Sequence, residues 1–119
     1  MFLVLFILHD VELIDDILNA WEEVGVGGAT VLRSYGLGRI RKIGLREDIP
    51  LFPSLEQLLE NEEEFSRTLL TIVDNREVVD KVVEATQSIT GNLDKPDTGL
   101  LAVLPVEQVY GLQNRNYNK

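Results

Sequence analysis

The segment GVGGATVLRSYGLGRIRKIGLR, which spans Gly25–Arg46, joins three elements of different character. It begins at a glycine suited to the end of a helix, continues through a strand predicted over residues 29–35, and then enters a Gly-x-Gly turn. Because residues 1–32 contain six carboxylates and no Lys or Arg, we interpret the basic segment as a contact-making loop on an acidic body. Five of the eleven Lys and Arg residues of the chain lie in this segment: Arg33, Arg39, Arg41, Lys42 and Arg46.

The composition is that of one globular domain of 119 residues. A net charge of −9 argues against nucleic-acid binding, because phosphate contacts need a basic face. The absence of Cys excludes disulfides and thiolate chemistry, and it favours a cytoplasmic setting. The apolar run Phe2–Leu8 is shorter than the roughly 18 residues of a membrane-spanning helix. We therefore expect a buried strand there, with no membrane insertion and no signal peptide.

Apolar periodicity predicts the elements before the basic segment. The strand at 2–8 is continuously apolar, so both of its faces should be buried. Asp10 can cap a helix that runs to about Val24, and Gly25 can end that helix in a left-handed conformation. The inward stripe of this helix contains Trp21, which we expect in the core.

A long polar segment follows the Gly-x-Gly turn and extends from Gly36 to about Phe65. It is interrupted by Pro50 and Pro53, is expected to contain a short helix at 55–63, and is long enough to predict a mobile loop over about 36–66. Strand character returns at 68–73, Asp74 and Glu77 form a helix start signal, and Gly91 ends that helix. A strand at 100–106 and a short extension at 108–112 complete the pattern. We expect one domain over 1–112 and a flexible tail over 113–119.

The order strand, helix, strand, strand, helix, strand predicts an α+β fold. Its four strands form an antiparallel sheet that carries both helices on one face. Three of the predicted strands look apolar on both sides, so something must also cover the second face. Another copy of the chain is the simplest candidate.

The segments EVGVGGATVLRSYGLGR (Glu23–Arg39) and VLPVE (Val103–Glu107), with the order of elements over 1–112, resemble the PII family of nitrogen-regulatory signalling proteins. The resemblance implies a ferredoxin-like βαββαβ sandwich and a homotrimer with its sheets packed inside. It also implies a long mobile loop that docks on a target protein, here through Arg39, Arg41, Lys42 and Arg46. Adenine nucleotides bind to such proteins in clefts between subunits, near the base of the loop.

The resemblance carries over only part of the family's ligand site. Thr30 matches a threonine near the adenine base, and Gly36, Gly38 and Arg39 match the turn at the loop base. Asp97, Thr98 and Gly99 correspond to part of a phosphate-binding loop whose lysine is replaced by Leu100. A glutamine of the family becomes Ile40, and two late arginines become Gly111 and Gln113. No tyrosine lies between Gly36 and Phe65, so the tyrosine-modification switch of some members is missing.

The resulting expectation is a trimeric regulator that senses a small anionic effector, with an adenine nucleotide as the candidate and weak binding of ATP. The alternatives are a ligand-free trimeric interaction module and a CutA-like trimer. No nucleophile–base pair and no metal set stand out, so an enzyme is not expected. His9, the only histidine, fits a strand-end position better than a metal site, and the acids Glu60, Glu62, Glu63 and Glu64 fit a solvated face.

Overall fold

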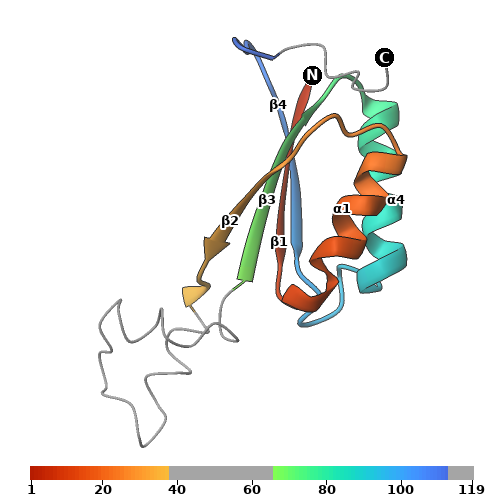
Figure 1. Cartoon of the computed structure of the whole chain (residues 1–119), viewed down its shortest axis with the longest axis vertical. Coiled ribbons are helices and arrows are strands. Elements are labelled where there is room, and N and C mark those ends of the chain that lie inside the picture. Colours follow the sequence, from red (N-terminus) through yellow and green to blue (C-terminus); the bar gives the residue numbers. More distant parts are fainter. Residues whose placement is uncertain (38–65, 113–119) are drawn as a thin grey trace, which may run out of the picture.

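The computed structural model describes residues 1–37 and 66–112. Its strands pair antiparallel in one four-stranded sheet of order β2-β3-β1-β4 (Figure 1). This is the predicted ferredoxin-like βαββαβ arrangement. The elements in chain order are β1 (Phe2–Leu8), the 3₁₀ turn η1 (Val11–Leu13), α1 (Ile14–Glu23), β2 (Thr30–Ser34), β3 (Ser66–Val73), α4 (Arg76–Thr90) and β4 (Leu100–Pro105).

Several predicted boundaries shift by one or two residues. β2 and β4 are shorter than predicted, while β3 begins two residues earlier, at Ser66. The predicted extension at 108–112 is not a strand. The short helix predicted at 55–63, most of the predicted loop and the tail at 113–119 lie outside the described residues.

The helix starts differ from the prediction for local geometric reasons. The Asp10 carboxylate accepts a hydrogen bond from the Glu12 backbone N–H at 3.1 Å, but the first turn is 3₁₀ and α1 begins only at Ile14. The prediction of Asp74 as the second cap is wrong. Asn75, in extended conformation, accepts a bond from the Val78 N–H at 3.0 Å and caps α4 instead.

The two helix ends confirm the predicted glycines. Gly25 has φ +107° directly after the last turn of α1, and Gly91 has φ +85° at the end of α4. Both values lie in the range that glycine adopts most readily.

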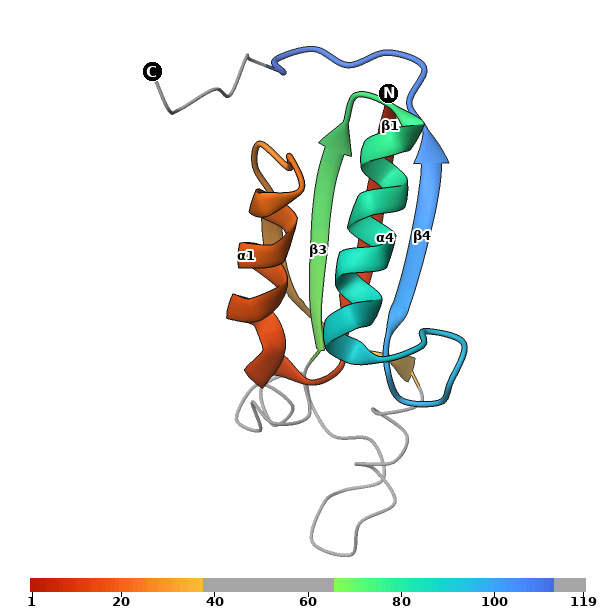
Figure 2. The ribbon, with the colours of Figure 1, turned by 90° about the vertical axis from the view of Figure 1, so that its right-hand side faces the viewer.

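Both helices pack on the same face of the sheet (Figures 1 and 2). Alternate residues of β1 point toward them and are fully buried, namely Val4, Phe6 and Leu8. Residues from β3 and both helices complete this core, as predicted for Trp21; they are Leu69, Val73, Ile17, Trp21, Val79 and Val82. Each such side chain contributes roughly 1.5–3 kcal/mol of gross transfer free energy.

The opposite face of the sheet is also apolar, and none of the described elements covers it. The register places Leu3, Leu5 and Ile7 of β1 beside residues of β3 and β4 on this side. We call it the open face; its apolar members are Leu3, Leu5, Ile7, Leu32, Leu70, Ile72, Leu100, Ala102 and Leu104. Leu32, Leu100 and Leu104 are large side chains left exposed to solvent. The strands are therefore apolar on both faces, as the sequence predicts.

One polar network crosses the interface between the two helices. The Trp21 indole N–H donates to the Thr86 hydroxyl at 2.9 Å, and this hydroxyl donates to the Val82 carbonyl at 2.7 Å. Trp21 and Thr86 are both buried, so the indole N–H depends on the Thr86 hydroxyl for its acceptor.

Replacing Thr86 with Val should destabilise the protein by about 1–3 kcal/mol, because the buried indole N–H loses its acceptor. Urea unfolding at a fixed protomer concentration measures the change. Ser88→Ala is the matched control on the same helix, because its exposed hydroxyl bonds only to the Ala85 carbonyl. A loss in Thr86→Val no larger than in Ser88→Ala would show that the network contributes little.

Candidate functional site

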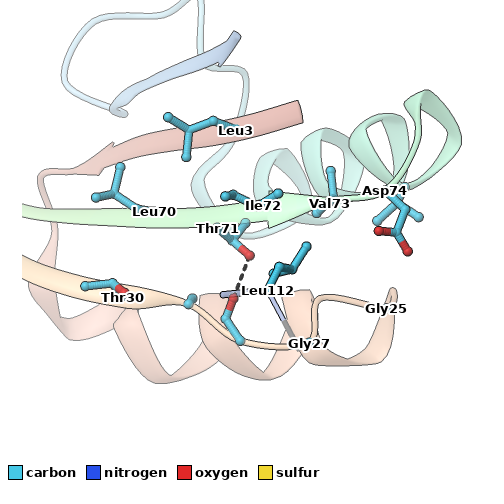
Figure 3. Close-up of a pocket in the computed structure, with 13 residues that line it drawn as sticks. Leu3, Gly25, Gly27, Thr30, Leu70, Thr71, Ile72, Val73, Asp74 and Leu112 are labelled. Atoms are coloured by element: carbon cyan, nitrogen blue, oxygen red, sulfur yellow. Dashed lines mark hydrogen bonds between the residues drawn. The ribbon is translucent and has the colours of Figure 1, made fainter. Parts of the chain in front are cut away.

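A pocket of about 780 Å³ lies at the end of the sheet where β2 separates from β3 (Figure 3). One wall is the connection from α1 to β2, formed by Gly25 and residues 27–30. The second wall is the end of β3, residues 70–74, and Leu3, Val78 and Leu112 contribute single side chains. Its volume is in the range typical of small-molecule sites.

A hydrogen bond from Thr71 fixes the shape of this pocket. The Thr71 hydroxyl donates to the Gly28 carbonyl at 2.6 Å (Figure 3). Thr71 is buried on the helix-facing side of the sheet, so the Gly28 carbonyl is held there and is not directed along the plane of the sheet. The last paired rung between β2 and β3 is Thr30 with Leu70. The pocket begins where this pairing stops.

The lining exposes polar and apolar surface in about equal measure and carries one ionisable side chain. That residue is the exposed Asp74; no Lys, Arg or His is among the described residues that line the pocket. Thr30 and Thr71 add hydroxyls, and the glycines expose backbone amides. The described walls therefore suit an uncharged or cationic group, and an anion bound here would need a cation from elsewhere.

The structure places the predicted ligand residues at different parts of the sheet. Thr30 lines the pocket, whereas Gly36 follows the far end of β2, and residues 97–99 precede β4. Since β2 and β4 are the opposite edges of the sheet, three strand spacings, or about 14 Å, separate them. A single chain does not bring the two groups into one cleft. Gly38, Arg39, Arg41, Lys42 and Arg46 lie outside the described residues.

The Asp97–Gly99 turn has a structural explanation of its own. Gly99 has φ +137°, and a Cβ at this position would lie 2.7 Å from the Ile7 carbonyl oxygen and 3.0 Å from the Phe6 ring. Asp97 adopts φ +65°, and the Thr98 hydroxyl donates to the Lys95 carbonyl at 3.0 Å. Close packing against β1 therefore requires glycine at 99, whether or not a ligand binds. Leu100, which follows this turn, is 58% exposed.

Gly99→Ala should destabilise the fold by at least about 1–3 kcal/mol, the cost of a strained backbone conformation, with the clash against β1 added. Gly36→Ala is the control, because its Cβ would meet nothing within 4 Å and its φ is not positive. Thermal and urea unfolding of both variants test this. Equal stabilities would mean that the packing around Gly99 relaxes freely.

A group of hydroxyl side chains, which the sequence pattern does not single out, lies at the base of the long segment. The Thr68 hydroxyl donates to Ser34 Oγ at 2.8 Å, Ser34 Oγ and Ser66 Oγ are 2.8 Å apart, and the Ser66 hydroxyl donates to the Ser34 carbonyl at 3.1 Å. One rung further along, Arg33 and Arg67 are cross-strand partners. Sequence periodicity did not single out these residues, because the chemistry arises only from the register of β2 against β3.

In the described part of the chain, no group of three or more His, Cys, Asp or Glu side chains could hold a metal ion, and no helix is long and apolar enough to cross a membrane.

Comparison with individual curated proteins gives no match. The family model for the nitrogen regulatory protein P-II matches residues 1–116. The chain therefore belongs to the nitrogen regulatory protein P-II family, whose members are regulators and not enzymes.

Proposed function

We propose that the chain forms a homotrimer in the cytoplasm, senses a small anionic effector and docks on a target protein through the segment at about 36–66. The observation that carries this proposal is the family match over residues 1–116. The open face, the separated halves of the ligand site and the basic cluster at the start of the long segment (Arg39, Arg41, Lys42 and Arg46) support its individual parts.

The open face supports self-association. Nine apolar side chains from all four strands lie on it, and three of the large ones are exposed in the single chain. A contiguous apolar surface of this kind usually marks an interface. Three sheets packed face to face around an axis would cover it in the symmetric manner common to homo-oligomers.

Assembly would also bring the halves of the ligand site together. The sheet has β2 at one edge and β4 at the other, so a ring of copies sets the β2 edge of one protomer beside the β4 edge of the next. Thr30 and Gly36 of one copy would then approach the Asp97–Gly99 turn of its neighbour. The separation of these residues in one chain is thus what an intersubunit site requires.

The charges of the chain favour an effector with few phosphates. The described pocket wall offers no cation, Leu100 replaces the family's lysine, and Gly111 and Gln113 replace its late arginines. Arg39 is then the principal anion ligand, because a guanidinium can bind a phosphate or carboxylate through two parallel hydrogen bonds. The same losses make a ligand-free interaction module the second candidate.

Sedimentation at micromolar concentration should show a trimer, and Leu5→Glu should convert it to a monomer. Leu5 lies on β1, in the interior of the open face, so burying its replacement would bring charges together in an apolar interface. Ser88→Glu adds the same charge on the exposed side of α4 and should leave the trimer intact. A monomeric unmodified chain would overturn the trimer and the intersubunit site with it.

Calorimetry with ATP, ADP, AMP and cyclic nucleotides tests the effector. Arg39→Ala should weaken binding roughly ten- to 150-fold, because a hydrogen bond to a charged group contributes about 1.5–3 kcal/mol. The trimer should persist in this variant. Sub-micromolar ATP binding would contradict the expected preference for fewer phosphates, and no binding of any nucleotide would favour the interaction module.

A further inference from the structure

The end of β3 offers backbone groups that no described strand pairs. β3 pairs with β1 from Arg67 to Val73, but its pairing with β2 stops at Leu70. In an antiparallel strand, successive residues direct their backbone N–H and C=O groups to opposite neighbours. At least one of Thr71, Ile72 and Val73 therefore presents both groups toward the pocket. Such an edge can accept an added extended segment.

The hydrogen bond between Thr71 and Gly28 keeps this edge accessible. Because the Gly28 carbonyl is bound at 2.6 Å on the helix-facing side, residues 27–29 do not continue the ladder of β2. The space left between this connection and the β3 edge is the pocket (Figure 3).

The segment after β4 leads the chain to the pocket. It crosses above the ends of β1 and β3 (Figure 2), starting with a hydrogen bond from the Val106 N–H to the Met1 carbonyl at 3.1 Å. It ends with Leu112, whose side chain lines the pocket. The seven residues that follow, QNRNYNK, therefore start at the rim of the pocket, and fully extended they span at most about 24 Å.

The chemistry of these seven residues complements the pocket. If this segment were extended, alternate side chains would share one side, so Arg115, Tyr117 and Lys119 would lie together and the three asparagines opposite. Tyr117 offers an aromatic ring to the apolar part of the pocket lining. Arg115 and Lys119 are the only charged side chains of the tail, and both are opposite in sign to Asp74.

We propose that residues 113–119 dock in the pocket of their own chain as an extended segment along the unpaired edge of β3, with a cation beside Asp74. The tail then occupies the space around Thr30. It would compete with an effector that uses Thr30, and this competition, unlike the docking itself, rests on the proposed function.

Amide hydrogen exchange on the full-length chain tests the docking without any effector. In the unmodified protein, the pocket-facing amides among residues 71–74 should be protected from hydrogen exchange. In the triple variant R115E/Y117S/K119E, the exchange rates of these amides should rise about tenfold. The matched control, N114S/N116S/N118S, changes the other side of the extended tail and should leave these rates unchanged. Amides of β3 that face β1 should not respond in either variant.

Two results would overturn the proposal. Equal exchange at residues 71–74 in the unmodified chain and in R115E/Y117S/K119E would show that the tail does not occupy the edge. In the monomeric Leu5→Glu variant, residues 71–74 could lose their protection while the strand amides of β1 keep theirs. That result would show that a second copy of the chain, and not the tail of the same chain, covers the edge of β3. Protection retained in that monomer supports docking within one chain. Because none of these measurements needs a nucleotide, a failure here is distinguishable from a failure to bind an effector.

Discussion

The organisation of the described part of this protein depends on having only two helices for a sheet that is apolar on both faces. Two helices cover one face of a four-stranded sheet, whereas its strands carry apolar side chains on both faces. β1, which lies inside the sheet, buries Val4, Phe6 and Leu8 against the helices and turns Leu3, Leu5 and Ile7 to the other side. Hydrophobic burial on the helix side can fold the chain, but it leaves an apolar surface that water does not favour. The described elements complete the fold within one chain, but they leave one face of its sheet uncovered.

The fold was predictable because its signals are local and repeated. Continuous apolar runs predicted β1, β3 and β4, a period of 3.6 residues predicted both helices, and glycines marked both helix ends. The errors arose where neighbouring residues offer the same chemistry. Asp74 and Asn75 can both cap a helix, and only the backbone conformation at Asn75 decides between them. Asp10 bonds to the next turn as predicted, yet that turn is 3₁₀.

The candidate site was less predictable, because it depends on register and on close approach. Thr30 was identified from a family resemblance, but Thr71 reads as an ordinary buried β-branched residue until its bond to Gly28 is seen. Gly99 looks like a ligand-binding glycine in the sequence, although contact with Ile7 and Phe6 already accounts for it. Asp74 gives the pocket a negative charge, and the whole chain carries −9. The long-range field therefore disfavours an approaching anion, so affinity for one must come from short-range contacts.

The rungs at the end of the β2–β3 ladder combine two opposing terms. The hydroxyls of Ser34, Ser66 and Thr68 bind one another across the strands, and such a pair of strands gains about 0.2–1 kcal/mol from each favourable cross-strand contact. One rung away, the like charges of Arg33 and Arg67 oppose the pairing by a similar amount. Three hydroxyl contacts stand against one like-charge pair, so the balance favours a closed end of the ladder. The long segment therefore leaves the sheet at rungs where side-chain hydroxyls tie the two strands together in addition to the strand pairing.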